Sequence, residues 1–168
     1  MNKSLNSQVK YLWLLVYFFL PVTGGFSQSL AYKALLGTLY EEDFPVLRPS
    51  EIQNLDNYQI LDTREVEEYA VSHLKGAINV GFDHFSISQL DQLDPKRPVL
   101  VYCTVGARSQ EIGKKLTEKG FTVYNLYGGI FQWVNDGRQV YDDNGITNRV
   151  HTYNLAWSIW LEKGEIVY

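Results

Sequence analysis

The chain has 168 residues, which suits one domain rather than two, and its 15 Lys and Arg side chains against 19 Asp and Glu give a formal net charge of −4. The basic residues are scattered among acidic ones, so we expect no nucleic acid partner. One cysteine excludes an internal disulfide, and the three histidines show no metal-ligand spacing, so neither a metal nor a cofactor is predicted.

The first residues are typical of an export signal. Lys3 and Lys10 precede an unbroken apolar and aromatic run from Tyr11 to Leu20, and small residues just before Gln28 suit a signal peptidase. We therefore predict a signal peptide over residues 1–27 and an exported protein, either periplasmic or secreted. The alternative is an uncleaved anchor, but the run is well short of the roughly 20 apolar residues that a membrane-spanning helix needs. No stable membrane span is expected after processing.

Residues 28–44 mix small, aromatic and acidic side chains, and we predict an N-terminal segment that runs over the surface. Alternating strand and helix patterns then fill residues 45–136. Apolar runs predict strands at 45–47, 59–62, 76–80, 99–102 and 121–124, and helical spacing predicts helices after Ser50, over 64–72, weakly over 86–93, over 110–120 and after Gly129. This alternation indicates an α/β domain whose parallel sheet is covered on both faces, with strand 99–102 near the centre because it is the most hydrophobic.

The helix over 64–72 is predicted to be amphipathic. Its apolar positions, expected to face inward, are Val66, Tyr69 and Ala70, and its solvated positions are Glu65, Glu67 and Glu68.

Residues 137–168 form a C-terminal extension of different character. A strand over 138–141, a turn over 142–145, a helix around 154–161 and a final strand over 165–168 are predicted. Because this strand-helix-strand segment is rich in aromatic residues, we expect it to pack on the domain rather than to form a free tail. His151 is expected to pack or hydrogen-bond within it, and the alternative is that it lines the mouth of the pocket.

Cys103 is the residue that carries the chemistry. It follows the central strand and opens a short loop into a helix, where the helix N-terminus favours the reactive thiolate. Gly106 allows the tight curvature that turns backbone N–H groups toward the sulfur. Four residues separate Cys103 from Arg108, one fewer than in cysteine phosphatases, so the loop suits a sulfur atom better than a phosphate group. Sulfur transfer is therefore favoured over phosphate ester hydrolysis.

Four segments together resemble the rhodanese family, and specifically its single-domain members. They are Asp62-Thr63-Arg64 with Glu68-Tyr69, the run from His73 to Val80, the loop from Cys103 to Ser109, and Leu126-Tyr127-Gly128-Gly129 with Trp133. The resemblance implies a rhodanese-like three-layer sandwich with a central, mostly parallel five-stranded sheet.

The resemblance also implies the roles of the site residues. Cys103 would be the catalytic nucleophile, carrying sulfane sulfur as a persulfide from a donor such as thiosulfate to a thiol or cyanide, with a protein thiol as a further candidate acceptor. Asp62 and Arg64 would support the site through hydrogen bonds. Glu68 departs from members of the family that present a cation near this position, and its carboxylate would repel a dianion such as thiosulfate. Arg108 would attract an anionic donor, and Ser109 would either bind substrate or cap the helix. The expected substrate-binding loop consists of Thr104, Val105, Gly106, Ala107, Arg108 and Ser109.

Two other functions remain open at this point. One is a rhodanese-fold module that binds a protein partner, which the joint presence of Cys103, Gly106 and Arg108 disfavours. The other is a thiol or persulfide sensor without turnover.

Overall fold

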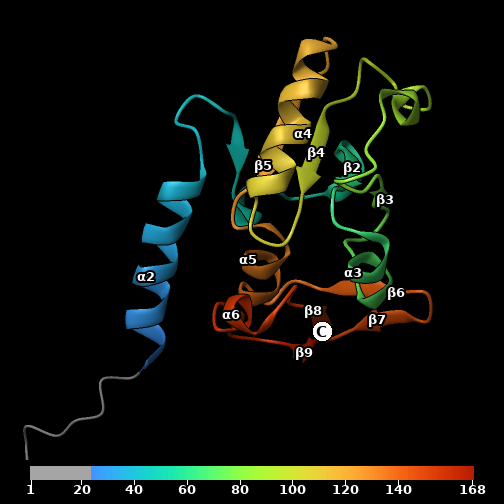
Figure 1. The fold of residues 1–168 in the computed structure, drawn as a ribbon. Coiled ribbons are helices and arrows are strands. Elements are labelled where there is room, and N and C mark those ends of the chain that lie inside the picture. The colour runs from blue at the N-terminus through green and yellow to red at the C-terminus, as the bar shows by residue number, and fades with distance from the viewer. Residues whose placement is uncertain (1–23) are drawn as a thin grey trace, which may run out of the picture.

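A computed structural model describes residues 24–168 of the chain, with side chains from residue 30 onward. Its centre is a sheet of five parallel strands in the order β1-β5-β4-β2-β3 (Figure 1). The strands are Val46–Leu47 (β1), Gln59–Asp62 (β2), Ile78–Asn79 (β3), Val99–Tyr102 (β4) and Val123–Leu126 (β5), and the helices beside them are Val66–Val71 (α3), Ala107–Glu118 (α4) and Gly129–Asn135 (α5). The predicted α/β fold with a central five-stranded parallel sheet is confirmed.

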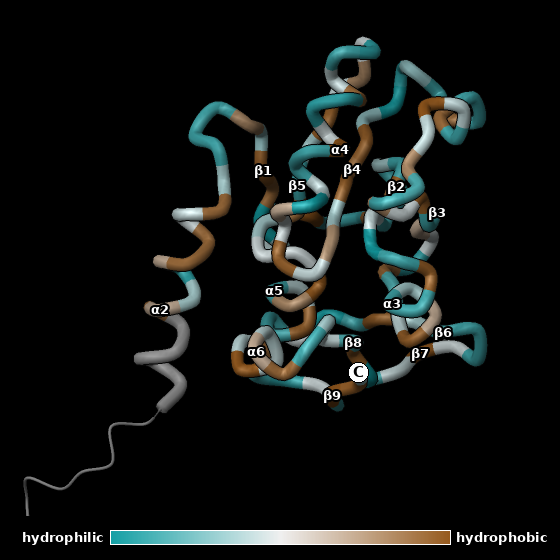
Figure 2. The backbone as a smooth tube through the Cα atoms, viewed as in Figure 1, coloured by the Kyte–Doolittle hydropathy of each residue, from teal (hydrophilic) through white to brown (hydrophobic). Residues whose placement is uncertain are grey.

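Strand β4 is the middle strand, and all four of its residues are buried because both faces of the sheet are covered. Val99 and Val101 pack into one hydrophobic cluster with Ile112 of α4. Leu100 and Tyr102 pack into a second cluster, which includes α5. The apolar colouring of β4 inside the fold follows from this double burial (Figure 2). Packing on both faces therefore holds the carboxyl end of the strand, which Cys103 follows.

The segment between β1 and β2 differs from the helix predicted after Ser50. It forms two short 3-10 turns, Pro49–Glu51 (η2) and Leu55–Asn57 (η3). The Asn54 side chain accepts a hydrogen bond from the N–H of Asp56 at 2.9 Å. Such a local side-chain bond competes with helix formation and favours a turn.

Helix α3 also corrects a prediction about which side chains face solvent. Val66 and Ala70, expected inside, are exposed, whereas Glu68, expected in a solvated position, is buried. Periodicity places a carboxylate on the solvent-exposed face of a helix. An oppositely charged partner from another element can offset the cost of burying that carboxylate.

Other boundaries also shift. Helix α4 begins at Ala107 rather than Gln110, because the loop turns into the helix directly at Gly106. Strand β5 spans 123–126 rather than 121–124, because the N–H of Phe121 still bonds to Leu116 of α4 at 3.2 Å. Within 86–93 only a 3-10 turn forms, Ile87–Leu90 (η4).

The N-terminal segment is helical, unlike the irregular surface path expected for residues 28–44. Helix α2 (Gly24–Leu39) buries Tyr32 and Leu36 in the cluster that also holds α5. The Tyr32 ring stacks on Trp160 of the C-terminal extension, with ring centroids 5.6 Å apart. No helix within residues 24–168 is long and apolar enough to cross a membrane. Most of the predicted signal peptide lies outside the described residues.

The C-terminal extension contains two strands more than predicted. Its Val140, Val150 and Leu161 side chains are buried in the α5 cluster, whereas two of its aromatic residues, Tyr153 and Tyr168, are 57% and 62% exposed. In Figure 1 the extension lies beneath the end of the sheet. Its elements are an antiparallel hairpin of Val140–Asp142 (β6) and Gly145–Thr147 (β7), a parallel pair of Arg149–His151 (β8) and Glu165–Val167 (β9), and the helical turn Leu155–Ser158 (α6).

The burial of α2 leads to a stability prediction with a matched control on the same helix. Leu36 is fully buried and Leu30 is 66% exposed. We expect Leu36→Ala to lower the free energy of unfolding by about 2–5 kcal/mol because it leaves a cavity, and Leu30→Ala to change it by less than about 0.5 kcal/mol. Urea unfolding followed by circular dichroism measures both. Equal effects of the two substitutions would show that α2 is not part of the core.

Candidate active site

The loop that follows β4 turns back on the sulfur of Cys103. The N–H of Gly106 donates a hydrogen bond to Cys103 Sγ at 3.1 Å. Gly106 has a φ of +104°, which is unfavourable for residues with a Cβ, and a Cβ there would collide with the Tyr40 hydroxyl. The sulfur therefore lies at the N-terminus of the twelve-residue helix α4, where the helix dipole favours an anion.

Helix α5 holds the first half of the loop. The N–H of Ile130 donates to the Cys103 carbonyl at 2.9 Å, and the N–H of Phe131 donates to the Thr104 carbonyl at 3.2 Å. The backbone approaches closely at Gly129, where a Cβ would collide with the Cys103 carbonyl. The two glycines at 128 and 129 thus let α5 begin directly against the loop.

Two further side chains hold the second half. Tyr40, just after α2, donates its hydroxyl hydrogen to the Val105 carbonyl at 2.6 Å and accepts from the N–H of Gly128 at 2.7 Å. Asn125 of β5 donates through Nδ2 to the Gly106 carbonyl at 2.8 Å. Tyr40 and Asn125 were not singled out from the sequence, because their roles depend on contacts across the fold.

Arg108 forms a bidentate ion pair with Glu68, in which Nη1 and Nη2 each lie 2.8 Å from a carboxylate oxygen. Only 21% of the Arg108 side chain and 4% of the Glu68 side chain are exposed. The Thr104 hydroxyl completes the cluster, donating to Glu68 and accepting from Arg108 at 3.0 Å each. The charges expected to attract or repel an anionic donor are therefore directed at each other.

Both members of this pair remain ionised at neutral pH. Burial opposes the charge of Glu68, but the hydrogen bond and charge of Arg108, with the more distant Arg64, hold the pKa of Glu68 below its usual value. Burial likewise opposes the charge of Arg108, while Glu68 and the Cys103 sulfur raise its pKa.

Asp62 and Arg64 form a second, fully buried ion pair at 2.6 Å. Asp62 also accepts a hydrogen bond from the Tyr102 hydroxyl at 2.5 Å, and Arg64 donates to the Ser72 carbonyl at 2.6 Å. The pair fixes the end of β2 next to the end of β4 and lies away from the pocket.

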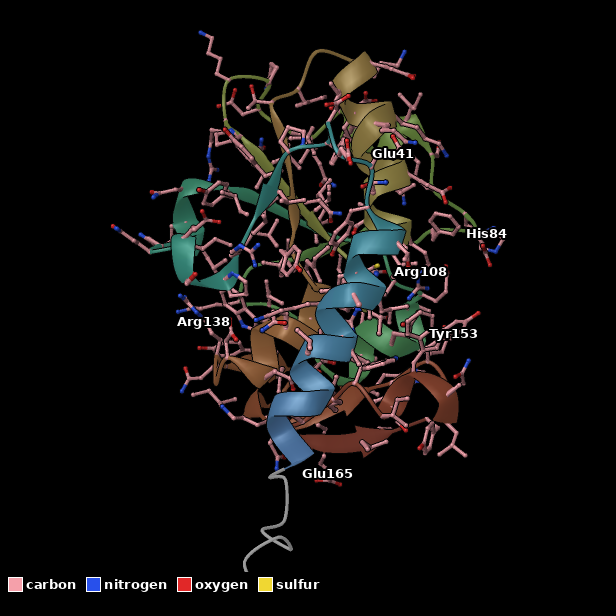
Figure 3. All side chains as sticks on the ribbon, turned by 90° about the vertical axis from the view of Figure 1, so that its left-hand side faces the viewer. Glu41, His84, Arg108, Arg138, Tyr153 and Glu165 are labelled. Carbon is pink, nitrogen blue, oxygen red and sulfur yellow. The ribbon has the colours of Figure 1, made fainter. Side chains whose placement is uncertain are left out.

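A pocket of about 220 Å³ opens over Cys103, which is itself only 1% exposed. Gly106 and Ser109 do not line it, and the Ser109 hydroxyl instead donates to Asn125 at 2.7 Å. Arg108 and Tyr153 lie on the same side of α2 (Figure 3). The lining residues are Leu39, Cys103, Thr104, Val105, Ala107, Arg108, Tyr153 and Trp157.

Leu39, Tyr153 and Trp157 were not among the sequence-predicted site residues. His151 does not line the pocket; its Nδ1 accepts a hydrogen bond from the N–H of Tyr153 at 3.1 Å. Burial lowers the pKa of His151, which suits an imidazole that accepts a hydrogen bond. Within residues 24–168 no cluster of His, Cys, Asp and Glu side chains could hold a metal ion.

A cysteine loop at the carboxyl end of the central parallel strand, closed by a helix N-terminus, defines a class of α/β proteins with an anion-stabilising thiol site. The chain belongs to the rhodanese family: the model of the rhodanese-like domain matches residues 49–136.

Sulfurtransferases are among the relatives in sequence. The adenylyltransferase and sulfurtransferase UBA4 of Meyerozyma guilliermondii is 31% identical over 65% of this chain, which spans 29% of that protein. The thiosulfate sulfurtransferase GlpE of Coxiella burnetii is 37% identical over 44% of this chain and 69% of its own length. The tRNA uridine(34) hydroxylase of Cytophaga hutchinsonii is 32% identical, and the chain spans 39% of it.

Two solved structures share the fold. The thiosulfate sulfurtransferase of Pseudomonas aeruginosa is 28% identical with a TM-score of 0.54, over 66% of this chain and 23% of its own. The BH2092 protein of Bacillus halodurans is 20% identical with a TM-score of 0.55, over 70% of this chain and 88% of its own.

The Glu68–Arg108 pair leads to a pH prediction. Because the folded state lowers the pKa of Glu68 below its ordinary value of 4.5, the pair stabilises the protein above that pH and loses its effect as the pH falls through the folded-state pKa. Glu68→Gln should lower the free energy of unfolding by about 1.5–3 kcal/mol at neutral pH. It should also reduce the loss of stability on acidification.

Urea unfolding between about pH 7 and about pH 3 measures both effects, within the range over which carboxylates titrate. The matched control is Glu67→Gln, because the neighbouring Glu67 is exposed. The same acid sensitivity in Glu68→Gln as in the unaltered protein would contradict the pKa assignment.

Proposed function

We propose that the protein is a sulfurtransferase that carries sulfane sulfur on Cys103 as a persulfide. The observation that carries this proposal is the Gly106 N–H bonded to Cys103 Sγ at 3.1 Å, at the N-terminus of α4. This arrangement favours a negative charge on the thiolate and then on the persulfide. The sulfurtransferase relatives named above support the same chemistry.

With thiosulfate as donor, the reaction needs no oxidant. The Cys103 thiolate attacks the outer sulfur, a new bond forms between Sγ and that sulfur, and the bond within thiosulfate breaks as sulfite leaves with the electron pair. A thiophilic acceptor such as cyanide then attacks the outer persulfide sulfur and leaves as thiocyanate. This second step returns Cys103 to the thiolate, so no base beside the sulfur is required.

Cys103→Ser tests the proposal, because the substitution nearly preserves volume and removes the soft nucleophile. After incubation with thiosulfate, the intact mass of the unaltered protein should increase by one sulfur atom, and Cys103→Ser should show neither this increment nor sulfur transfer to cyanide. Because the chain has one cysteine, the position of the adduct is unambiguous. Sulfite, which has no sulfane sulfur to give, is the control donor.

Retention of sulfur transfer by Cys103→Ser would contradict the proposed nucleophile. An unaltered protein that takes up sulfur but passes it to no acceptor would be a persulfide sensor, and one that takes up none would favour a binding module.

We further propose that the protein is exported with removal of residues 1–27. The support is the Lys3 and Lys10 pair before the apolar run, together with the position of the buried α2 residues. A cut before Gln28 shortens α2 but retains Tyr32 and Leu36, so the remaining chain keeps the side chains that pack this helix.

N-terminal sequencing of the protein isolated from its native host tests export. We expect the chain to begin at Gln28. A full-length chain recovered from the cytosol would contradict the proposal.

A further inference from the structure

The outer wall of the Cys103 pocket comes from segments outside residues 49–136, which match the rhodanese-like domain. Leu39 belongs to the end of α2, and Tyr153 and Trp157 belong to the C-terminal extension. All three contribute apolar or aromatic surface. The loop side adds Val105 and Ala107, so most of the pocket wall around the sulfur is apolar.

Arg108 is the one cation among the lining residues, and it is already paired with a carboxylate. Both ends of its guanidinium meet the Glu68 carboxylate at 2.8 Å, and the Tyr153 ring covers it with 5.3 Å between Cζ and the ring centroid. A doubly charged donor entering this pocket would lose its water and meet no lining cation that lacks a carboxylate partner, which is unfavourable. A sulfur donor with an apolar body and a lower charge loses less hydration free energy when it enters the pocket.

The turn that presents the aromatic wall is held in a specific shape. Tyr153 has a φ of +65°, which is rare for a residue with a side chain, and its N–H donates to His151 Nδ1 at 3.1 Å. Asn154 accepts hydrogen bonds from the N–H groups of Ala156 and Trp157 and so caps α6. Strained backbone of this kind persists where surrounding contacts hold it, and it is common at ligand sites.

The volume also suits an organic group. A cavity of about 150 Å³ lined by apolar side chains is enough to bind benzene. The pocket over Cys103 measures about 220 Å³, and Leu39 and Trp157 are among its lining residues. An aromatic ring can therefore lie on the wall while its sulfur atom reaches Cys103.

From these observations we infer that the pocket takes sulfane sulfur from an apolar organic carrier of low charge, such as an aryl persulfide or aryl thiosulfonate, in preference to thiosulfate. The inference rests on the proposed sulfur transfer and adds its substrate class. With a thiosulfonate, the Cys103 thiolate attacks the terminal sulfur, the new disulfane bond forms, and the donor's bond between its two sulfur atoms breaks as the sulfinate leaves with the electron pair. With a persulfide, the leaving group is the thiolate of the carrier.

The test compares benzenethiosulfonate with methanethiosulfonate, and includes thiosulfate as the dianionic donor. The two thiosulfonates carry the same charge and react at the same group, so the ratio of their kcat/KM values for transfer to cyanide reports contact of the phenyl ring with the wall. In the unaltered protein, benzenethiosulfonate should give the highest kcat/KM of the three. Trp157→Ala should lower the phenyl-to-methyl ratio by about two- to tenfold, as expected for loss of an aromatic contact.

Leu39→Ala is the second variant, because it removes a lining side chain that belongs to a different helix, and it should lower the same ratio. Leu155→Ala is the matched control: Leu155 lies on α6 but is 74% exposed and does not line the pocket, so the ratio should not change. Thermal unfolding checks that each variant is folded.

Sulfur transfer from all three donors with an unchanged ratio in both Trp157→Ala and Leu39→Ala would overturn the inference and leave the proposed function intact. A higher kcat/KM for thiosulfate than for benzenethiosulfonate in the unaltered protein would do the same. Absence of transfer from every donor would overturn the proposed function and, with it, the inference.

Discussion

The carbonyl oxygens of the loop after β4 need hydrogen-bond donors from elsewhere, because the loop folds in on the Cys103 sulfur and leaves regular secondary structure. Each carbonyl from residue 103 to residue 106 accepts such a bond: two from the N-terminus of α5, one from Tyr40 and one from Asn125. A buried carbonyl without a partner would destabilise the loop, so these contacts hold its shape. The position of the sulfur thus depends on three elements that are distant in the sequence.

The same constraint explains what could be predicted from the sequence. Strand β4, the loop and α4 are adjacent in the chain and carry a continuous apolar run, a glycine and a helical pattern, so their order and chemistry follow from local rules. Tyr40 pairs with a carbonyl 65 residues away, and no local pattern predicts such a bond. Helix α2 did have a signal, because Tyr32, Leu35, Leu36 and Leu39 follow the i, i+3, i+4, i+7 spacing.

Glu68 illustrates a different limit of sequence reasoning. Its position among Glu65 and Glu67 makes a solvated role the natural expectation, and only the fold brings it to Arg108, 40 residues away. The pairing changes the chemistry attributed to both side chains. The Glu68 carboxylate offsets the charge of Arg108, so the backbone of the loop and α4 adds to what the guanidinium contributes in favouring the sulfur anion. The sequence shows which residues are charged, but it does not show which of them are paired with each other in the fold.

Tyr153 places an aromatic ring where the backbone conformation favours glycine or asparagine. A left-handed conformation at a residue with a side chain costs about 1–3 kcal/mol, and its neighbours His151 and Asn154 hold the turn in place. Stability and pocket shape therefore make opposite demands on this one position. Directed evolution for heat resistance alone would favour glycine there, and the gain would come with loss of the ring that covers the Arg108 guanidinium.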